Sequence, residues 1–326
     1  NQFGARRTVS HDSSMTSLGP TNRSILVTGG AGFIGSHLVD ALVDENDVCV
    51  LDDLSRGARD TLPDGVAFVE ADVRNATAVE DACADVDLVF HHAANISVER
   101  SVSDPVGSHR TNVDGTLNVL EAARDADARV VFASSAAVYG APSTVPVAES
   151  QRKSPSSPYG AEKLSADRYV RLYADLYDLE TVALRYFNVY GPGGIATDYS
   201  GVIDAFLTRA RRDEELPVHG HGTQTRDFVH VSDVVQANLL AAETDHVGDA
   251  YNVGTGESVT INRLANLIVD VTDSASTIVH TPPRPGDIDE SEAGIGRAHD
   301  RLGYRPRTTL QDGLEELVNA ETPPRG

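Results

Sequence analysis

Lysine is nearly absent from this chain: only Lys153 and Lys163 carry an ammonium among its 326 residues. Lysine and arginine together number 27 against 49 aspartates and glutamates, which gives a net charge of -22. Because nucleic acids and anionic membrane surfaces attract basic patches, this shortage of positive charge argues against both as partners. Such an acidic surface is also typical of proteins from salty, halophilic cytoplasm, where screening weakens the repulsion between like charges.

Cysteine and long apolar runs are also scarce. Cys49 and Cys83 are the only two cysteines, and they lie far apart in apolar segments, which favours reduced thiols in a cytoplasm over a disulfide. No segment approaches the roughly 20 apolar residues that span a bilayer. The arginine pair near the start is not followed by the apolar region of an export signal. We therefore expect residues 1–22 to be a disordered leader of a cytoplasmic protein.

Short apolar runs alternate with helical patterns through the first half of the chain. The patterns predict helices near residues 76–84, 108–125 and 157–178. Strands that alternate with helices indicate right-handed crossovers, so we predict an α/β fold with a doubly wound parallel Rossmann sheet. No internal repeat or low-complexity segment interrupts this alternation.

The alternation fails from about residue 189, where glycine, proline and arginine gather in loops. A chain of this length also favours about two domains. We predict a Rossmann domain from residues 23–188 plus 229–254. Residues 189–228 plus 255–326 are then expected to form a smaller C-terminal α/β domain that faces the carboxyl ends of the strands.

Three glycines follow the first predicted strand and precede a helix: Gly29, Gly32 and Gly35. Glycines at such a turn allow backbone N–H groups and the helix N-terminus to approach a pyrophosphate. Asp52 ends the second strand 20 residues after Gly32, the spacing at which a carboxylate binds the adenosine ribose. The pattern predicts a dinucleotide-binding site.

Asp52 and its neighbour Asp53 also select the cofactor. A carboxylate here accepts a hydrogen bond from the free 2′-hydroxyl of NAD and repels the 2′-phosphate of NADP. Arg56 is the nearby cation placed to compensate a 2′-phosphate, and its spacing also suits a solvated loop residue. We therefore predict that NAD is the cofactor.

Tyr159 and Lys163 stand four residues apart in a predicted helix, so both lie on one face. A phenol with a pKa near 10 is a poor base at neutral pH, but an adjacent ammonium and an oxidised nicotinamide both favour its phenolate. The compact charge of lysine can also bind ribose hydroxyls. A strand ends nearby in Ser134 and Ser135, at the sheet edge where ligands bind in this type of fold. This group of side chains predicts proton transfer to a substrate oxygen.

These segments together resemble the extended short-chain dehydrogenases, and most of all the UDP-glucose 4-epimerase group of NAD-dependent epimerases and dehydratases. The resemblance runs from about residue 24 almost to the end of the chain. It rests on motifs in the family's order: TGGAGFIG, LDDLSRG, ADVRN, HHAA, TNVDGT, ASSAAVYG, SPYGAEK, RYFNVYGP, GTQTRDFVHVSD, YNVGTG and RPGD.

The resemblance implies catalytic roles for Ser135, Tyr159 and Lys163, of which Ser135 and Tyr159 also touch the substrate. It implies further contacts with NAD from two sets of residues. One set extends the glycine turn and the acidic strand end: Phe33, Ile34, Asp53, Leu54, Ser55, Arg56 and Gly57. The other lies further along the chain: Asp72, Val73, His92, Ala93, Ala94, Thr111, Asn112 and Phe187.

The resemblance also implies a UDP-sugar substrate held by the second domain. Arg226 and Arg284 would bind the diphosphate or its ribose, with Asn188 near the phosphates and Asp287 near the ribose. His219 takes the place of an aromatic residue that often stacks on uracil. His219 and His221 could suggest a metal, but no cluster of acids or cysteines completes a site, so we expect none.

The implied reaction is 4-epimerisation of UDP-glucose and UDP-galactose, and of their N-acetyl forms, through a transient 4-keto sugar. Dehydration is disfavoured because Ala136 and Ala137 occupy the places of a catalytic acid pair. Decarboxylation or epimerisation of UDP-glucuronate stays open, as does a non-catalytic NAD-responsive binding protein. The resemblance further implies a homodimer packed through the helices near 108–125 and 157–178.

The resemblance also implies that side-chain size at Ser291, four residues after Asp287, decides which sugars enter. A small serine leaves room for an N-acetyl group. Alternatively, Ser291 could be the N-cap of a surface helix that starts at SEAG, since serine is favoured there.

The acid at the end of the second strand gives a testable prediction. The protein should bind NADH more tightly than NADPH, because the 2′-phosphate meets the carboxylate of Asp52. Equilibrium titration with both reduced cofactors measures the difference. Tighter binding of NADPH would contradict the assignment.

Overall fold

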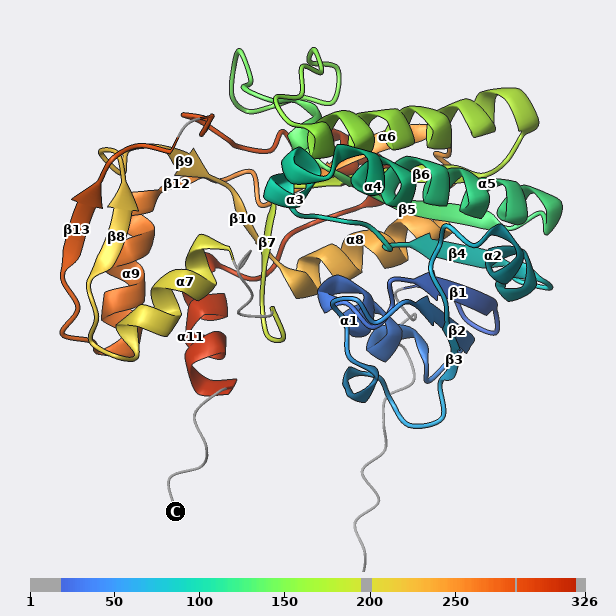
Figure 1. Ribbon diagram of the computed structural model, residues 1–326, viewed down its shortest axis with the longest axis horizontal. Coiled ribbons are helices and arrows are strands. Elements are labelled where there is room, and N and C mark those ends of the chain that lie inside the picture. Colours follow the sequence, from blue (N-terminus) through green and yellow to red (C-terminus); the bar gives the residue numbers. More distant parts are fainter. Residues whose placement is uncertain (1–18, 195–200, 285, 321–326) are drawn as a thin grey trace, which may run out of the picture.

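The computed structural model describes residues 19–194, 201–284 and 286–320. Its centre is a seven-stranded sheet in the order β3-β2-β1-β4-β5-β6-β11, with every neighbouring pair parallel (Figure 1). The predicted doubly wound Rossmann sheet is thereby confirmed. The strands are β1 (Ser24–Thr28), β2 (Asp47–Asp52), β3 (Ala67–Glu70), β4 (Leu88–His91), β5 (Arg129–Ser135), β6 (Thr181–Tyr186) and β11 (Asp249–Val253).

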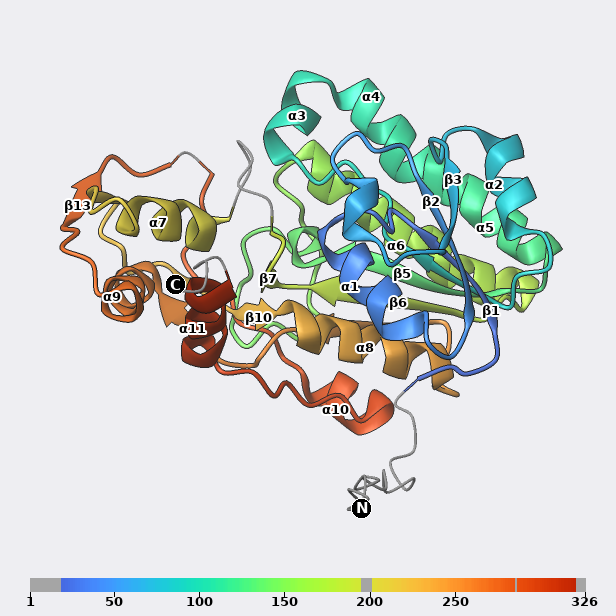
Figure 2. The ribbon, with the colours of Figure 1, turned by 90° about the horizontal axis from the view of Figure 1, so that it is seen from below.

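Helices cover both faces of this sheet because the strands are apolar on both sides. On one face lie α2 (Ala76–Cys83), α5 (Gly115–Asp125) and α6 (Pro158–Tyr177). On the other lie α1 (Phe33–Leu42), α8 (Val231–Glu243) and α10 (Gly296–Leu302), as Figure 2 shows. The two layers enclose separate cores, one on each side of the strands.

A smaller lobe stands beyond the carboxyl ends of the strands, to the left in Figure 1. Its helices are α7 (Val202–Ala210), α9 (Ile261–Thr272) and α11 (Leu310–Ala320). They pack with β8 (Leu216–His219), which pairs with β13 (Ile278–Thr281), around a third core. Two short pairs join this lobe to the sheet: β7 (Asn188–Tyr190) with β10 (Phe228–His230), and β9 (Thr225–Arg226) with β12 (Val259–Thr260).

The predicted domain boundaries differ from the packing at one place. Residues 255–326 were all expected in the smaller domain, yet Ala298, Leu302 and Tyr304 join the core between the sheet and α8. The hydroxyl of Tyr304 donates to the carbonyl of Gly254 at 2.9 Å. The segment around α10 thus returns to the large domain, which no local pattern in the sequence reveals.

The helix predicted over 108–125 is divided in the structure. It comprises α4 (Pro105–His109), a π-helical stretch, η2 (Arg110–Asp114), and α5. A short helix, α3 (Val98–Ser103), precedes it, and 3-10 turns occur at η1 (Arg59–Thr61) and η3 (Ala136–Val138). Single π-helical turns often mark functional sites, and this one borders the cavity described below.

The predicted leader covers residues that the structure only partly describes, since 1–18 lie outside the described residues. Residues 19–22 are attached to the fold: Asn46 donates to the carbonyl of Pro20 at 2.9 Å, and the backbone N–H of Asn22 donates to Glu45 at 2.8 Å. Residues 19–22 of the predicted leader are therefore ordered. Cys49 and Cys83 carry free thiols. Among the helices of the described ranges, none combines the length and apolar character needed to cross a bilayer.

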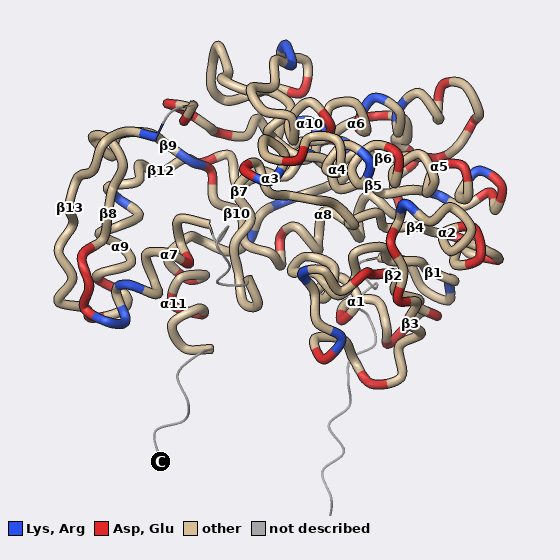
Figure 3. Tube along the Cα trace, in the orientation of Figure 1, with Lys and Arg blue, Asp and Glu red and all other residues tan. Residues whose placement is uncertain are grey.

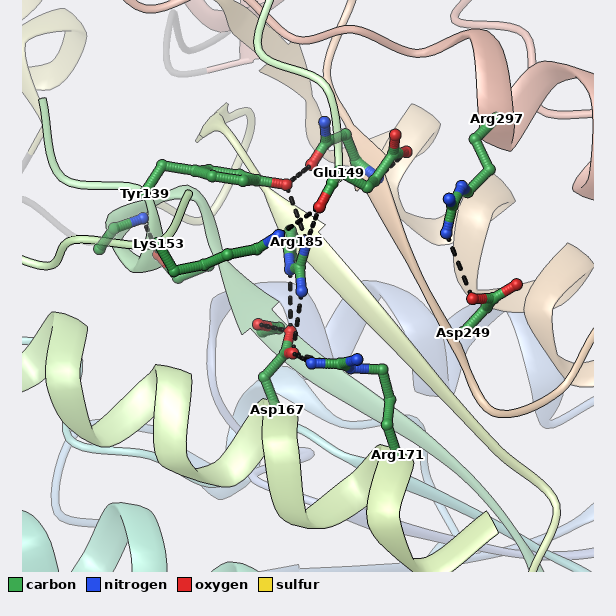
Figure 4. A network of polar contacts seen from close by, with 12 residues as sticks. Tyr139, Glu149, Lys153, Asp167, Arg171, Arg185, Asp249 and Arg297 are labelled. Carbon is green, nitrogen blue, oxygen red and sulfur yellow. Dashed lines mark hydrogen bonds and ion pairs between the residues drawn. The ribbon is translucent and has the colours of Figure 1, made fainter. Parts of the chain in front are cut away.

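A buried ion pair attaches α6 to the sheet (Figure 4). Both oxygens of Asp167, on α6, accept from the guanidinium of Arg185, on β6, at 2.9 Å. The hydroxyl of Ser134, on β5, donates to the same carboxylate at 2.9 Å, and Arg171 donates at 3.1 Å. Burial alone would raise the pKa of Asp167, but the hydrogen bonds and charges of Arg185 and Arg171 lower it. Asp167 is therefore a carboxylate that links one helix to two strands.

Replacing Asp167 with asparagine should destabilise the protein by about 3–5 kcal/mol, because Arg185 would keep a buried charge without a partner. Denaturant unfolding measures the difference. Glu180→Gln is the control, since it breaks the exposed ion pair with Arg129 and should cost about 1 kcal/mol or less. A loss for Asp167→Asn no larger than for this control would contradict the structural role.

Candidate active site

A cavity of about 550 Å³ opens at the carboxyl ends of the sheet strands, between the sheet and the start of α7. Its walls come from the loops after β1, β2, β3, β4 and β5, from the first turns of α6, and from the segment that joins β6 to β7. The size is that of pockets that hold a cofactor or a drug-sized ligand. Ligands bind at this edge in doubly wound sheets.

The glycines of the first turn leave no room for side chains. Gly29 has a φ of +70°, and a Cβ atom there would lie 2.5 Å from the backbone nitrogen of Ala93. A Cβ at Gly35 would lie 2.2 Å from the carbonyl oxygen of Gly29. Gly32 is the N-cap of α1, where no side chain caps the helix and no acid lies in the first turn. The turn therefore presents a helix N-terminus with favourable potential for a pyrophosphate.

Asp52 ends β2 beside this turn and is buried. One of its oxygens accepts from the backbone N–H of Ala31 at 3.0 Å, and the other from that of Leu54 at 2.9 Å. Burial raises the pKa of Asp52, and these two hydrogen bonds oppose the rise. The carboxylate is thus held in place at the cavity wall and keeps lone pairs for ribose hydroxyls.

Most of the residues predicted to bind NAD or to act in catalysis line this one cavity. They are Gly29, Gly32, Phe33, Ile34, Gly35, Asp52, Asp53, Ser55, Arg56, Gly57, Asp72, Val73, His92, Ala93, Ala94, Thr111, Ser135, Tyr159, Lys163 and Phe187, together with Asn188. Leu54 and Asn112 lie behind the wall. Leu54 adopts a φ of +54° in the turn after Asp52, and Asn112 is buried in η2.

The start of α6 places Tyr159 and Lys163 in the cavity wall. Ser157 caps the helix by accepting from the N–H of Gly160 at 3.1 Å, and Pro158 occupies the first turn, where a missing N–H costs nothing. Tyr159 then falls in the first turn and Lys163 in the next. The ammonium of Lys163 donates to the carbonyl of Ala133 on β5 at 2.8 Å, which ties it to the adjacent strand end.

Burial dominates the protonation of these two residues. It raises the pKa of Tyr159, and a hydrogen bond with Ser135 opposes the rise only in part. The net pKa of Tyr159 therefore lies above the ordinary value of a phenol. That an oxidised nicotinamide and the ammonium of Lys163 together favour the phenolate stays a prediction. Burial lowers the pKa of Lys163 to about 8, against the opposing charge of Glu162.

Glu162 is a buried acid between the two, and the sequence prediction missed it. Its carboxylate accepts from Asn112 at 2.6 Å and from Ser108 at 2.7 Å. The side chain of Asn112 also accepts from the backbone N–H of Asn95 at 2.7 Å and donates to its carbonyl at 2.9 Å. Glu162 therefore connects α6 with α4 and η2, and its charge favours the ammonium of Lys163. An acid on the buried side of an amphipathic helix is the signal that could have revealed it.

The histidines near the cavity are neutral. His91 is buried between the hydroxyls of Thr28, at 2.7 Å, and Thr116, at 3.0 Å, and burial lowers its pKa to about 3. Burial lowers the pKa of His92 to about 4, and its ring stacks on Tyr186 with centroids 6.1 Å apart. Such low values do not suit general acids or bases at neutral pH.

The predicted substrate residues other than Ser135, Tyr159 and Asn188 lie outside this cavity, on the smaller lobe and its loops. Arg226, on β9, forms an ion pair with Asp287 and donates to the carbonyl of Ile288 at 2.8 Å. His219, at the end of β8, contacts the hydroxyl of Thr281 at 2.8 Å. Arg284 is exposed in the loop after β13. The structure thus brings Arg226 and Asp287 together, whereas His219 ends β8 and Arg284 lies in the loop after the neighbouring strand β13.

Ser291 is buried, and its N–H lies 3.4 Å from the hydroxyl of Thr225. The alternative that Ser291 starts a helix is wrong, because residues 291–295 form no helix and α10 begins at Gly296. Asp227 fixes the chain just beyond. It is fully buried, and its carboxylate accepts from the backbone of Ala293 at 3.0 Å and Thr255 at 2.8 Å.

Metal ligands do not gather at the site. Across the described ranges, no group of three or more histidine, cysteine, aspartate or glutamate side chains is placed to hold a metal ion. The predicted pair of His219 and His221 therefore has no third ligand of these types among the described residues.

Known proteins resemble this chain in sequence and in structure over most of its length. A putative UDP-glucose 4-epimerase of Methanocaldococcus jannaschii is 40% identical over 299 residues, which cover 90% of this chain and 97% of that protein. The structure of a UDP-N-acetylglucosamine 4-epimerase from Methanobrevibacter ruminantium, in complex with UDP-N-acetylmuramic acid, has a TM-score of 0.88. It is 38% identical and covers 92% of this chain and 98% of that one.

A structure with the cofactor is also similar. The UDP-glucose 4-epimerase of Thermus thermophilus, solved in complex with NAD, has a TM-score of 0.84 and 36% identity, covering 91% of this chain and 98% of that one. The family described as the NAD dependent epimerase/dehydratase family matches residues 25–254, which include the glycine turn, Asp52 and the Tyr159–Lys163 pair. The chain therefore belongs to the NAD-dependent epimerase/dehydratase family and uses NAD as its cofactor.

Proposed function

We propose that this protein is a nucleotide-sugar 4-epimerase that interconverts UDP-glucose and UDP-galactose, and their N-acetyl forms. The observation that carries the proposal is the meeting of Ser135, Tyr159 and Lys163 in the wall of a cavity built for a dinucleotide. The similar proteins named as UDP-sugar 4-epimerases support it over nearly the whole chain.

Three side chains of this cavity, Ser135, Tyr159 and Lys163, take part in the transfer of one proton. Ser135 hydrogen-bonds the oxygen at C4 of the sugar, and Tyr159 removes the proton of that hydroxyl and later returns it. Lys163 holds a positive charge near the phenol and binds a ribose hydroxyl. Bound NAD supplies the acceptor and then the donor of the hydride at C4, and in its oxidised form it adds positive charge to the cavity. The 4-keto sugar turns between the two transfers, so no net oxidation occurs.

The smaller lobe is proposed to hold the UDP group. Arg226 and Arg284 bind the diphosphate, where guanidinium groups form charge-assisted hydrogen bonds, and Asn188 reaches it from the cavity. Asp287 binds the ribose and His219 stacks on uracil. The domain division follows: residues 23–188 plus 229–254 bind NAD, and 189–228 plus 255–326 bind the nucleotide sugar, except that the segment around α10 supports the large domain.

Elimination of water is disfavoured by the turn that follows β5. Ala136 and Ala137 stand directly after Ser135 in η3, and neither can transfer a proton. Glu162, which lies beside Lys163, already accepts hydrogen bonds from Asn112 and Ser108.

We further propose that the protein forms a homodimer through α3, α4 and α6. Within the described ranges, the large exposed apolar side chains all lie in two segments: Ile96, Val98, Val102 and Val106, and Tyr169, Leu172, Leu176 and Tyr177. Both α3 and α4 contact α6, so the two segments lie on adjoining helices. An apolar patch of this extent marks a protein interface. Its place differs in part from the predicted one, because α5 contributes none of these residues.

The acidic composition supports two further proposals, namely a cytoplasmic location and adaptation to high salt. Repulsion among the carboxylates is weakened as salt shortens the screening length. Light scattering in molar and in dilute salt tests the dimer and its salt dependence together. A chain that is monomeric in molar salt would exclude the proposed interface.

The catalytic assignment predicts the effect of Tyr159→Phe. Turnover of UDP-glucose to UDP-galactose should fall by about 10²–10⁴-fold, the usual contribution of a general acid–base group. Bound NAD, released by denaturation and quantified, should stay at the wild-type level. Tyr169→Phe is the matched control, because Tyr169 is a tyrosine on the exposed side of the same helix.

Two results would overturn this proposal. A Tyr159→Phe variant with most of its activity would remove Tyr159 from the chemistry. Wild-type protein that holds NAD but converts neither UDP-glucose nor its N-acetyl form would contradict epimerisation. In that case, release of CO₂ from UDP-glucuronate would identify a decarboxylase.

The buried position of Ser291 predicts a separate effect on sugar choice. Ser291→Tyr should lower kcat/KM for UDP-N-acetylglucosamine by roughly tenfold or more relative to UDP-glucose, because the larger side chain fills the space for the acetamido group. Ser291→Ala should leave the ratio unchanged. Equal losses on both sugars would show that this residue does not select the substrate.

A further inference from the structure

A second cavity, of about 430 Å³, lies at the outer edge of the sheet beside β6 and β11. Its walls come from the segment 149–153, from α6, from these two strands, and from α10. It shares no lining residue with the catalytic cavity. It is therefore a separate site, on the part of α6 that faces away from Tyr159.

Positive charge is concentrated in this cavity. Five cations line it, against the carboxylates of Glu149 and Asp249: Lys153, Arg168, Arg171, Arg185 and Arg297. In the whole chain the ratio is reversed, with 27 lysines and arginines against 49 acids. Figure 3 shows how sparsely the cations are spread along the chain. One of only two lysines lies here.

The nearby carboxylates are occupied by other groups. Glu149 is buried and accepts from the backbone N–H of Asn252 at 3.0 Å. Asp249 pairs with Arg297 at 3.2 Å (Figure 4). It also pairs with Arg301. Asp167, beneath the cavity, is shared by Arg185 and Arg171. Each acid near the cavity is thus already bound to a partner.

Two of the cations have no carboxylate partner among the described residues: Lys153 and Arg168. The ammonium of Lys153 donates to the backbone carbonyl of Glu149, and Arg168 is exposed at the cavity wall. Burial and the charges of Arg185, Arg171 and Arg168 together lower the pKa of Lys153 to about 8, against the opposing charge of Asp167. The cavity therefore has a positive potential that the protein itself leaves uncompensated.

We propose that this cavity is a second anion-binding site that takes a phosphoryl group through Lys153, Arg168 and Arg171. Guanidinium and ammonium groups are the side chains that bind phosphate oxygens by charge-assisted hydrogen bonds. The volume exceeds that of inorganic phosphate and leaves room for a small phosphomonoester. Inorganic phosphate and a phosphomonoester both present the same dianionic group to these three cations.

The site has a direct structural connection to the catalytic cavity. Arg171 and Arg185 line the second cavity and bind Asp167, while Ser134 lines the catalytic cavity and donates to the same carboxylate at 2.9 Å. An anion at Arg171 competes with Asp167 for that guanidinium. The proposal concerns binding alone, and it stands whatever sugar the enzyme converts.

Calorimetric titration tests the proposal. Sodium phosphate and, separately, glycerol 3-phosphate are titrated into the NAD-loaded protein at constant ionic strength, with UDP present to occupy the diphosphate subsite. We expect one site per chain for at least one of these ligands. Tighter binding of glycerol 3-phosphate indicates a phosphomonoester as the source, and equal or tighter binding of inorganic phosphate indicates the free ion.

Variants then locate the site. Lys153→Gln with Arg168→Gln should weaken binding by at least tenfold. The control, Arg212→Gln with Arg263→Gln, removes the same charge from exposed positions on the smaller lobe and should leave binding unchanged. Melting curves in chloride check folding, and Arg168→Gln alone, at an exposed position, should still weaken binding several-fold. The absence of saturable binding to wild-type protein, or equal losses in the two double variants, would overturn the proposal.

Discussion

The carboxylate of Asp167 is the interaction on which the position of α6 depends. It is buried among Arg185 of β6, Ser134 of β5 and Arg171 of its own helix. Removing a charge from water is costly, so an acid at this depth is stable only with full hydrogen bonding. Because α6 is attached to both strands, its first turns lie at the strand ends. Tyr159 thereby faces the same cavity as the glycine turn.

A second buried acid repeats this arrangement one turn nearer the helix start. Glu162 binds Asn112 and Ser108, which fixes α6 against the divided helix of α4, η2 and α5. The two acids attach opposite sides of α6, one to the sheet and one to the neighbouring helices. The ammonium of Lys163, the residue after Glu162, donates to the carbonyl of Ala133. The proposed chemistry is therefore held by polar contacts as well as by apolar packing.

Because cations are scarce in this chain, the places where they cluster indicate functional or structural roles. In a chain with a net charge of -22, positive side chains occur beside Tyr159, in the Arg226–Asp287 pair, and around the second cavity. Lysine is retained where a compact charge contacts a backbone carbonyl, as Lys163 does at Ala133 and Lys153 at Glu149. Arginine is used where a planar group shares a carboxylate with others, as Arg185 does.

Much of the fold and of the cavity could be predicted from local patterns. The alternation of strands and helices, the spacing of Gly29, Gly32 and Gly35, and the acid 20 residues after Gly32 depend on backbone geometry within one βαβ unit. The Tyr159–Lys163 pair is likewise a matter of helical spacing. Such features are set by neighbours in the sequence, so they are visible in it.

Tertiary structure alone decided the rest. It brought Asp167 to Arg185 and Glu162 to Asn112, returned the segment of α10 to the sheet, and divided the helix at η2. It also buried Tyr159, and this burial raises the pKa of the phenol. The sequence by itself determined which groups are present and how each segment repeats. Burial and partners depend on contacts between distant segments, and these exist only once the chain is folded.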